Sequence, residues 1–281
     1  MPEPILHSRF NQTFEISYKN EKALYQMPPH THNAIEIYLN LSPIPRALIG
    51  GNVLSLLPKT LLILPSYCVH QLMPTEDAPY ERYVLTIHAD WLDPVIGGGN
   101  HSDFQYLKNP NAPLIIPLSD EVLAGLCQNL DNLLQCRASA PLAQLSCFFS
   151  AMQQIDSIAR PYIQKGTGNI RQTISGNARV VSEMLDYIHE HVYENLKISQ
   201  IANAFFLNPD YAARLFKKYT NTTIGNYITI QRMTRARQLL REGCSVSQVQ
   251  QLTGYESYEN FFRTFKKAVG CTPKEYRERI G

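Results

Sequence analysis

The chain has 281 residues, of which 44% are hydrophobic and 18% charged, and its formal net charge is +2. This length allows two domains of ordinary size, and the composition excludes a disordered or highly charged chain. The charge is unevenly divided: residues 179–281 carry 15 Lys and Arg against 10 Asp and Glu (+5), whereas residues 1–178 carry 11 against 14 (−3). A basic C-terminal part behind an acidic one suggests a nucleic-acid-binding module joined to another domain.

Several classes of protein are excluded by simple patterns. No apolar run approaches the ~18 residues that span a bilayer, and the first residues lack the basic and apolar regions of a signal peptide. The six cysteines form no C-x-x-C pair, which favours reduced thiols over a disulfide framework or a zinc cluster. We therefore expect a cytoplasmic protein that does not associate with a membrane.

Residues 1–115 have the pattern of short strands separated by turns. The segment AIEIYLNL (34–41) alternates apolar and polar residues, TLLILP (60–65) is typical of a short buried strand, and ERYVLTIHA (81–89) alternates again. Proline and glycine residues punctuate these runs. The pattern predicts a β-sandwich or β-barrel.

Residues 116–163 have a helical period instead. Ser119 is a candidate N-cap for a first amphipathic helix, and Pro141 stands where a second helix would begin. Two such helices either cover the β domain or form the antiparallel pair of a homodimer, and we expect dimerisation. The polar, glycine-rich segment that follows predicts an interdomain linker over 164–178.

Residues 179–281 are helical throughout and contain an approximate duplication. PDYAARLFKKYTN (209–221) matches YENFFRTFKKAVG (258–270) with both FKK triplets in register. Each copy follows a short helix and a turn, which predicts helix-turn-helix units over about 198–218 and 246–267. A long helix over about 224–241 would join them and place both second helices on one side of a DNA duplex.

This segment resembles the DNA-binding domain of the AraC/XylS family of transcription regulators over its whole length. The residues that carry the resemblance are Ile201-Ala202, Leu207-Asn208, Tyr211, Arg214-Leu215-Phe216-Lys217-Lys218, Tyr227, Arg232, Ala236, Leu239-Leu240, Gly254-Tyr255, Phe261, Arg263, Phe265-Lys266-Lys267 and GCTPKEYR (270–277). The resemblance implies an α+β multidomain protein: a cupin-like barrel, a helical pair and an all-α DNA-binding domain. It also implies transcription regulation on a double-stranded DNA operator, and contact with RNA polymerase if the protein is an activator.

The resemblance further implies which residues contact DNA. Those expected at base edges are Asp210, Ala213, Arg214, Ser257, Tyr258, Glu259, Phe262 and Arg263. Those expected at phosphates are Lys217, Lys218, Lys266 and Lys267.

Two of these roles have alternatives. Arg214 would pair with guanine or, alternatively, hold a phosphate or a surface salt bridge, and Glu259 would accept from cytosine or simply offset the helix dipole. Asn208 is expected to cap the first recognition helix, and Tyr211 to point into the core. Gln250 and Thr253 depart from the family pattern, so the second unit is expected to pack less well than the first.

Histidines in the N-terminal part define a second candidate site. PHTHNAIEIY places His30, His32 and Glu36 an even number of residues apart, on one face if the strand is unbroken, and His70 follows in LPSYCVHQL. The first pattern resembles the first cupin motif, and the second segment resembles the other motif less closely. The predicted effector-binding residues are His30, His32, Glu36, Tyr38, His70, Arg82 and Tyr83.

Histidine and tyrosine side chains suit a small polar metabolite such as a sugar. We therefore predict a ligand-responsive regulator without a cofactor or enzymatic activity. The alternatives are a divalent metal held by His30, His32, Glu36 and His70, as in a metal sensor or a metal-dependent cupin oxygenase or isomerase, and histidines with no ligand role.

Overall fold

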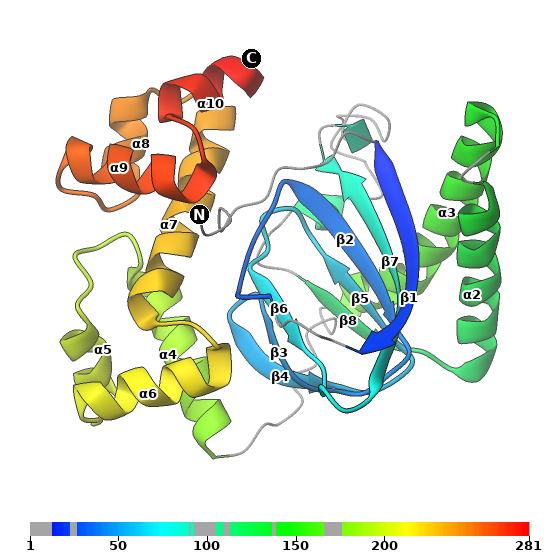
Figure 1. The fold of residues 1–281 in the computed structure, drawn as a ribbon, viewed down its shortest axis with the longest axis horizontal. Coiled ribbons are helices and arrows are strands. Elements are labelled where there is room, and N and C mark those ends of the chain that lie inside the picture. The colour runs from blue at the N-terminus through cyan, green and yellow to red at the C-terminus, as the bar shows by residue number, and fades with distance from the viewer. Residues whose placement is uncertain are drawn as a thin grey trace.

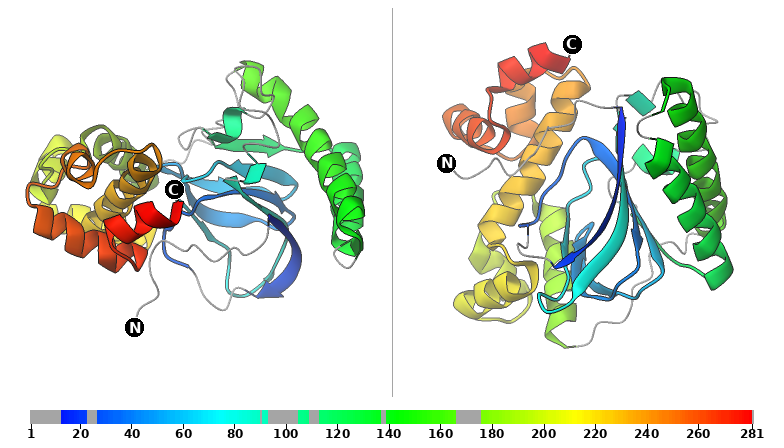
Figure 2. Two further views of the ribbon diagram at one scale, coloured as in Figure 1. Left: turned by 90° about the horizontal axis from the view of Figure 1, so that it is seen from above. Right: turned by 45° about the vertical axis from the view of Figure 1, so that its right-hand side comes forward.

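The computed structural model describes residues 13–22, 27–89, 91–92, 105–108, 113–136, 139–165 and 176–280. The N-terminal arm (1–12) and most of the predicted linker lie outside the described residues. The described chain forms a β domain between two helical layers, with α2 and α3 on one side and α4–α10 on the other (Figures 1 and 2). No helix of the described residues is long and apolar enough to cross a bilayer.

The β domain consists of two antiparallel sheets. The larger sheet has the order β1-β7-β2-β5-β8 and the smaller one β4-β3-β6. The strands are β1 (Phe14–Lys22), β2 (Ala34–Asn40), β3 (Ile44–Ile49), β4 (Asn52–Leu56), β5 (Thr60–Leu64), β6 (His70–Met73), β7 (Pro79–His88) and β8 (Leu114–Pro117). A short 3-10 helix, η1 (Gln105–Lys108), precedes β8. The strands predicted over 34–41, 60–65 and 81–89 are therefore confirmed as β2, β5 and β7.

The alternation along β2 separates two hydrophobic layers. Ile35, Ile37 and Leu39 belong to a core that continues into α2 (Asp120–Gln135) and α3 (Pro141–Lys165). Tyr38 points the other way and packs on the apolar residues between the two sheets. The helical pair thus covers the outer face of the larger sheet, and burial of its apolar stripe holds it there.

The C-terminal part is a chain of seven helices in the described residues. They are α4 (Asn177–His191), α5 (Ile198–Ala204), α6 (Pro209–Thr220), α7 (Ile224–Arg241), α8 (Val246–Leu252), α9 (Tyr258–Val269) and α10 (Pro273–Ile280). Helix α7 joins the first helix-turn-helix unit (α5–α6) to the second (α8–α9), as the duplication predicts (Figure 1).

Side-chain caps explain where several of these helices begin. The Ser119 hydroxyl accepts from the Val122 amide at the start of α2, and the Asn208 carboxamide accepts from the Asp210 amide at 2.9 Å at the start of α6. Each bond satisfies a backbone donor that the first helical turn leaves without an intrahelical partner. Both caps confirm the sequence-based expectation.

The first helix-turn-helix unit packs directly on the smaller sheet. Leu48 and Val53 share one buried cluster with residues of α4–α7, and the Val53 amide donates to the Ser182 hydroxyl of α4 at 3.2 Å. Gly51 lies so close to His189 of α4 that a β-carbon there would be 2.2 Å from the imidazole. The contact is therefore a close-packed interface between the β domain and the first unit.

Candidate functional site

The two recognition helices present matching polar faces. On α6, Asp210 and Arg214 are exposed and Ala213 is partly exposed, while Leu215 and Phe216 are buried. On α9 the positions expected at base edges are exposed apart from the partly buried Phe262. The last turns of α6 and α9 carry the exposed pairs Lys217-Lys218 and Lys266-Lys267. Each unit thus offers a polar helix start and a cationic helix end to solvent.

Tyr211 does not point into the core, contrary to the sequence-based expectation. Its side chain is 41% exposed, and the small neighbour Ala212 is the buried residue. Because α6 begins at Pro209, Tyr211 lies in the first turn beside Asp210, on the side that remains open to solvent.

The departures in the second unit are accommodated by hydrogen bonds. The Gln250 side chain is partly buried and donates to the Tyr255 backbone carbonyl. Thr253 is buried, and its hydroxyl donates to the Val249 carbonyl one turn earlier at 2.7 Å. Both polar groups therefore have partners, which removes most of the cost of burying them.

The histidines lie together at one end of the β domain, but not on the one unbroken strand that the sequence predicts. Strand β2 begins only at Ala34, so no unbroken strand carries His30 and His32 with Glu36. Instead, His30 forms an isolated antiparallel bridge with His70, with backbone bonds of 3.1 Å in both directions. Ring nitrogens of His30, His32 and His70 lie within 4.8 Å of one another.

Glu36 forms the anionic centre of this cluster. Its Oε2 lies 3.3 Å from His32 Nε2, 3.0 Å from His70 Nε2 and 3.0 Å from the Tyr38 hydroxyl that donates to it. Burial alone would raise the pKa of Glu36, but the charge of His32 and hydrogen bonds from His32 and His70 hold it well below the usual range. Burial lowers the pKa of His30 to about 3, so this ring is neutral.

Backbone carbonyls fix the orientation of two of the rings. His30 Nδ1 lies 3.1 Å from the Pro28 carbonyl, and His70 Nδ1 lies 3.0 Å from the Cys68 carbonyl. A carbonyl only accepts, so both Nδ1 atoms carry a proton, and the neutral form of each ring has a bare Nε2. In that form His70 Nε2 and the Glu36 carboxylate would be two acceptors facing each other at 3.0 Å. The pair therefore needs a proton or another cation between them.

The donor set fits a divalent transition metal. Three imidazoles and one carboxylate are ligands that zinc, iron and manganese accept, and carbonyl-bound Nδ1 protons orient the ring nitrogens toward a common centre. His30, His32, His70 and Glu36 are the residues that would hold such an ion. It would supply positive charge opposite the carboxylate and a Lewis acid at this end of the barrel.

The remaining predicted effector residues divide between the two faces of the larger sheet. Arg82 pairs with Asn40 across β2 and β7, donates to the Tyr80 carbonyl at 2.8 Å and lies over the Tyr80 ring. Tyr83 lies on the opposite face, where its hydroxyl donates to Asp131 of α2 at 2.8 Å. Its side chain faces the helical layer, and so the structure does not bring it to the histidine cluster.

The segment Ser66–His70 links the histidine cluster to the helical part, a connection that sequence reasoning missed. Tyr67 adopts a left-handed backbone (φ 65°), and its amide donates to the His32 carbonyl at 2.9 Å. The Tyr67 ring lies 5.2 Å from the guanidinium of Arg237 on α7. Arg237 is 1% exposed and also donates to the Tyr276 hydroxyl of α10 at 3.3 Å. No signal in the sequence distinguishes Arg237 from the partly buried arginines of the same helix.

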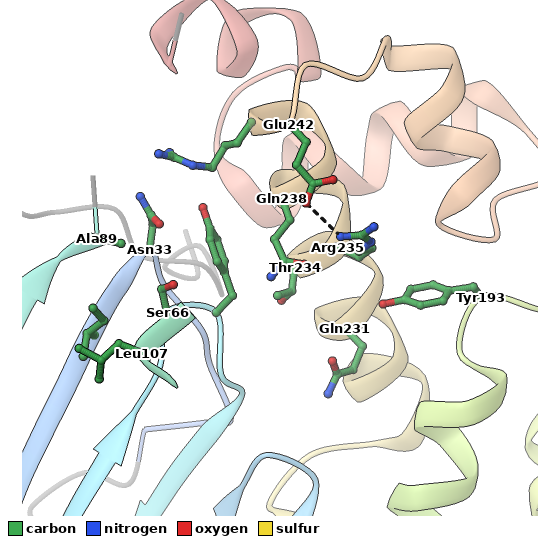
Figure 3. A pocket seen from close by; sticks show the side chains of 13 residues that line it. Asn33, Ser66, Ala89, Leu107, Tyr193, Gln231, Thr234, Arg235, Gln238 and Glu242 are labelled. Carbon is green, nitrogen blue, oxygen red and sulfur yellow. Dashed lines mark hydrogen bonds and ion pairs between the residues drawn. The ribbon is translucent and has the colours of Figure 1, made fainter. Parts of the chain in front are cut away.

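A cleft of about 600 Å³ lies beside this contact, between the β domain and α7. Figure 3 shows Asn33 and Ser66 on one wall and Gln231, Thr234 and Gln238 on the other. Arg235 is paired with Glu242 at 3.3 Å on the α7 side. Arg241 also lines the cleft. Its walls thus come from both parts of the molecule.

Comparison with known proteins identifies both parts. A family model described as an AraC-like ligand binding domain matches residues 17–166, and one described as a helix-turn-helix domain matches residues 201–279. The fold and the paired units therefore define a regulator with a ligand-binding domain and a helix-turn-helix domain. The chain belongs to the AraC family of transcription regulators.

Named relatives match less than half of the chain. The melibiose operon regulatory protein of Escherichia coli is 31% identical over 118 residues, which are 41% of this chain and 39% of that protein. The xylose operon regulatory protein of the same species is 32% identical over 99 residues, covering 35% of this chain and 25% of that protein. The chain thus spans well under half the length of these relatives.

Solved structures give weaker likenesses. The C-terminal domain of AraT from Geobacillus stearothermophilus has 26% identity and a TM-score of 0.36, covering 37% of this chain and 88% of that one. ToxT from Vibrio cholerae, solved with a bound unsaturated fatty acid, has 15% identity and a TM-score of 0.38, covering 96% and 97% of the two chains.

Proposed function

We propose that this protein is a cytoplasmic, non-enzymatic transcription regulator that binds operator DNA through α6 and α9 and responds to a small polar effector. The observation that carries the proposal is the pair of solvent-facing recognition helices joined by α7. Each combines an exposed polar start with an exposed lysine pair at its end. The starts suit base edges in the major groove, and the lysines suit phosphates on either side.

DNA binding is tested by its salt dependence. Operator fragments are first selected from genomic DNA with the full-length protein, and the affinity is then measured by fluorescence anisotropy over a range of salt concentrations. The logarithm of the affinity should fall steeply with that of the salt concentration, and replacing Lys217 or Lys266 by Ala should reduce the slope by about 1 each. Lys274→Ala, at an exposed position of α10, is the matched control. A flat salt dependence would refute DNA binding by these helices.

We place the effector at the histidine end of the barrel, on His30, His32, Glu36, Tyr38 and His70, with Arg82 four residues along β7 from Thr86, the cross-strand partner of Glu36. These side chains supply ring donors, a hydroxyl and a carboxylate in a partly apolar setting, which suits a hydroxyl-rich ligand. Two of the named relatives regulate sugar operons, and so we propose a sugar as the effector.

A panel of neutral sugars that includes melibiose and xylose, read by thermal shift, tests this assignment. A sugar at about 100 times its Kd should stabilise the protein by about 2.7 kcal/mol. Glu36→Gln should abolish the shift, whereas Arg241→Ala, in the interdomain cleft, should retain it. Loss of the shift in Arg241→Ala alone would place the effector in the cleft instead.

The segment Ser66–His70 is the proposed route from the effector to the DNA-binding helices. A ligand that contacts His70 moves or fixes the same segment whose Tyr67 packs on Arg237 of α7. Only a ligand with different affinities for two arrangements of these parts shifts the DNA affinity. Tyr67→Ala should therefore leave effector binding intact and reduce the effect of the effector on operator affinity. An unchanged effect would exclude this route.

We also propose that the protein is a homodimer through the outer side of α2 and α3. Leu142 is 79% exposed on α3, and Phe149 is exposed seven residues later on the same helix face. Light scattering of the double variant Leu142→Glu/Phe149→Glu should show a monomer, with Ser157→Glu on the same helix as control. A dimer that persists would exclude this surface. An activating role would add contact with RNA polymerase.

A divalent metal at the histidine cluster is the second candidate function. The observation in its favour is the geometry of the cluster: one ligand atom from each of His30, His32 and His70 lies within 4.8 Å of the others, and His70 Nε2 lies 3.0 Å from Glu36 Oε2. Elemental analysis of protein purified without chelator should then find one metal per chain, and His70→Ala should lose it. Absence of metal, together with no thermal shift on adding Zn²⁺, Mn²⁺ or Fe²⁺, would exclude this candidate.

A further inference from the structure

Two cysteines lie next to each other where the helical pair turns back on itself. Cys136 caps the C-terminal end of α2, and Cys147 lies in the second turn of α3. Their Sγ atoms are 2.8 Å apart and share a hydrogen bond. Both side chains are partly exposed. A formed disulfide has sulfurs about 2.05 Å apart, so a small change in side-chain torsion separates this pair from a bond.

The other four cysteines have different settings. Cys68 and Cys271 are buried, and burial raises the pKa of the Cys68 thiol to about 12. Cys127 is partly buried on α2, where burial and the nearby Asp131 carboxylate raise its pKa, just as the hydrogen bond with Cys136 raises the pKa of Cys147. Cys244 is partly buried at the end of α7. All six cysteines are free in the structure.

We propose that Cys136 and Cys147 are a redox-responsive pair that forms a reversible intrachain disulfide with low-molecular-weight disulfides such as oxidised glutathione. One thiolate of the pair attacks a glutathione sulfur, forms a mixed disulfide and releases one glutathione thiolate. The second thiolate attacks the protein sulfur of that mixed disulfide and releases the other glutathione. Two protein thiols are thus oxidised and one glutathione disulfide is reduced to two thiols, and the two protons lost by the protein thiols end on the two glutathione thiolates.

The bond would fix the turn between α2 and α3. Cys147 directly precedes Phe148, which is buried and stacks on Phe14 of β1 with ring centroids 4.4 Å apart. On its other side lies Phe149, part of the exposed apolar face of α3. A crosslink at Cys147 therefore restrains the point where α3 meets the larger sheet, and it does so over a short loop.

Mass spectrometry of the full-length protein tests the chemistry directly. The reduced protein is incubated with oxidised glutathione, its remaining thiols are alkylated, and it is digested without reductant. Before alkylation, we expect the intact mass to be lower than that of the reduced protein by two hydrogen atoms. The digest should contain a crosslinked peptide pair with Cys136 and Cys147. Dithiothreitol should reverse both changes. The variant Cys127→Ser, which changes a partly buried cysteine of the same helix, should give the same crosslink.

Three outcomes would overturn the proposal. They are stable glutathione adducts on Cys136 or Cys147 without the crosslink, a disulfide between two chains on non-reducing gels, and complete alkylation of both thiols after oxidant. Thermal unfolding gives an independent readout, because the bond should raise Tm by roughly 5 °C in the oxidised protein. Cys136→Ser and Cys147→Ser should each remove the rise, while Cys127→Ser should keep it. An unchanged Tm in crosslinked protein would exclude a restrained turn.

Discussion

The two helix-turn-helix units have the same arrangement of helices, but a different residue type occupies the left-handed position in the turn between them. In both, the second residue after the first helix has a left-handed backbone, Phe206 with φ 55° and Gly254 with φ 74°. Gly254 lies against the backbone of Tyr193, whereas Phe206 extends its ring into solvent and is 98% exposed. The turn itself therefore demands the left-handed conformation, and only the second unit also demands the absence of a side chain.

The units also differ in what they pack against. The core of the first unit includes Leu48, Val53 and Val69 of the β domain. The core of the second unit contains only residues of α7–α10 and the segments between them. The first unit is thus bound to the ligand-binding domain by shared burial, and the second is attached chiefly through α7.

The largest expected effect is at Gly254. A β-carbon there would be 2.4 Å from the Tyr193 carbonyl oxygen, in a backbone conformation that L-residues avoid. Gly254→Ala should therefore lower the free energy of unfolding by about 2–4 kcal/mol, measured by urea denaturation. Gly243→Ala, also left-handed but in open space, is the control and should cost less. Equal losses in the two variants would show that the contact with Tyr193 is unimportant.

The next effect concerns DNA affinity. Arg214 is exposed on α6, while Arg263 lies close enough to Asn260 for a weak hydrogen bond at 3.4 Å. We expect Arg214→Ala to weaken operator binding by about 1–3 kcal/mol and Arg263→Ala by less, at one fixed salt concentration. Binding curves in the reverse order would show that the second unit dominates recognition.

A smaller effect concerns the interface between the first unit and the β domain, because its contribution to the free energy of unfolding should depend on pH. Burial lowers the pKa of His189, which lies against Gly51 and within 3.2 Å of the Tyr227 hydroxyl. Below about pH 6.5 the unfolded chain binds a proton that the folded chain does not, so stability falls as the pH drops toward the folded pKa. His189→Gln should flatten this decline by at most about 1.4 kcal/mol per pH unit. An identical slope in the variant would rule His189 out as its source.

The smallest effect, of opposite sign, is expected at Phe206. Phe206→Gly relieves the left-handed strain and removes a ring that buries almost nothing, but it also makes the unfolded chain more flexible. The net gain in stability should be below about 1 kcal/mol. A loss of more than that in urea denaturation would show that the ring makes a stabilising contact.

Local patterns predicted the elements well because local physics determines them. The alternation of Ile35, Ile37 and Leu39 with polar neighbours marked β2, and Asn208 before Pro209 marked the start of α6. The prediction for Tyr211 is wrong because size and hydrophobicity favour its ring for the buried position, whereas the small Ala212 fills that position. The sequence does not show which face of β7 meets α2, and Tyr83 lies on that face, away from the histidine cluster.

Contacts between segments that are distant along the chain could not be predicted from the sequence. His30 reaches the cluster through its bridge with His70, which depends on strand pairing between distant segments. Arg237 is buried by Tyr67 and Tyr276, one from the β domain and one from α10. Neither partner is marked by spacing or composition, and only the packed structure shows them together.

The shared core of the first unit has a consequence for protein engineering. In the sequence, a polar, glycine-rich segment separates the ligand-binding and DNA-binding parts. This separation suggests that either part could be replaced by that of another regulator. In space, the apolar surface of Leu48, Val53 and Val69 completes the packing of α4–α7. A chimera that joins this β domain to the helices of another regulator therefore has to carry matching side chains on both sides of that surface. Otherwise the new partners would leave it exposed, and the fusion would be prone to aggregation.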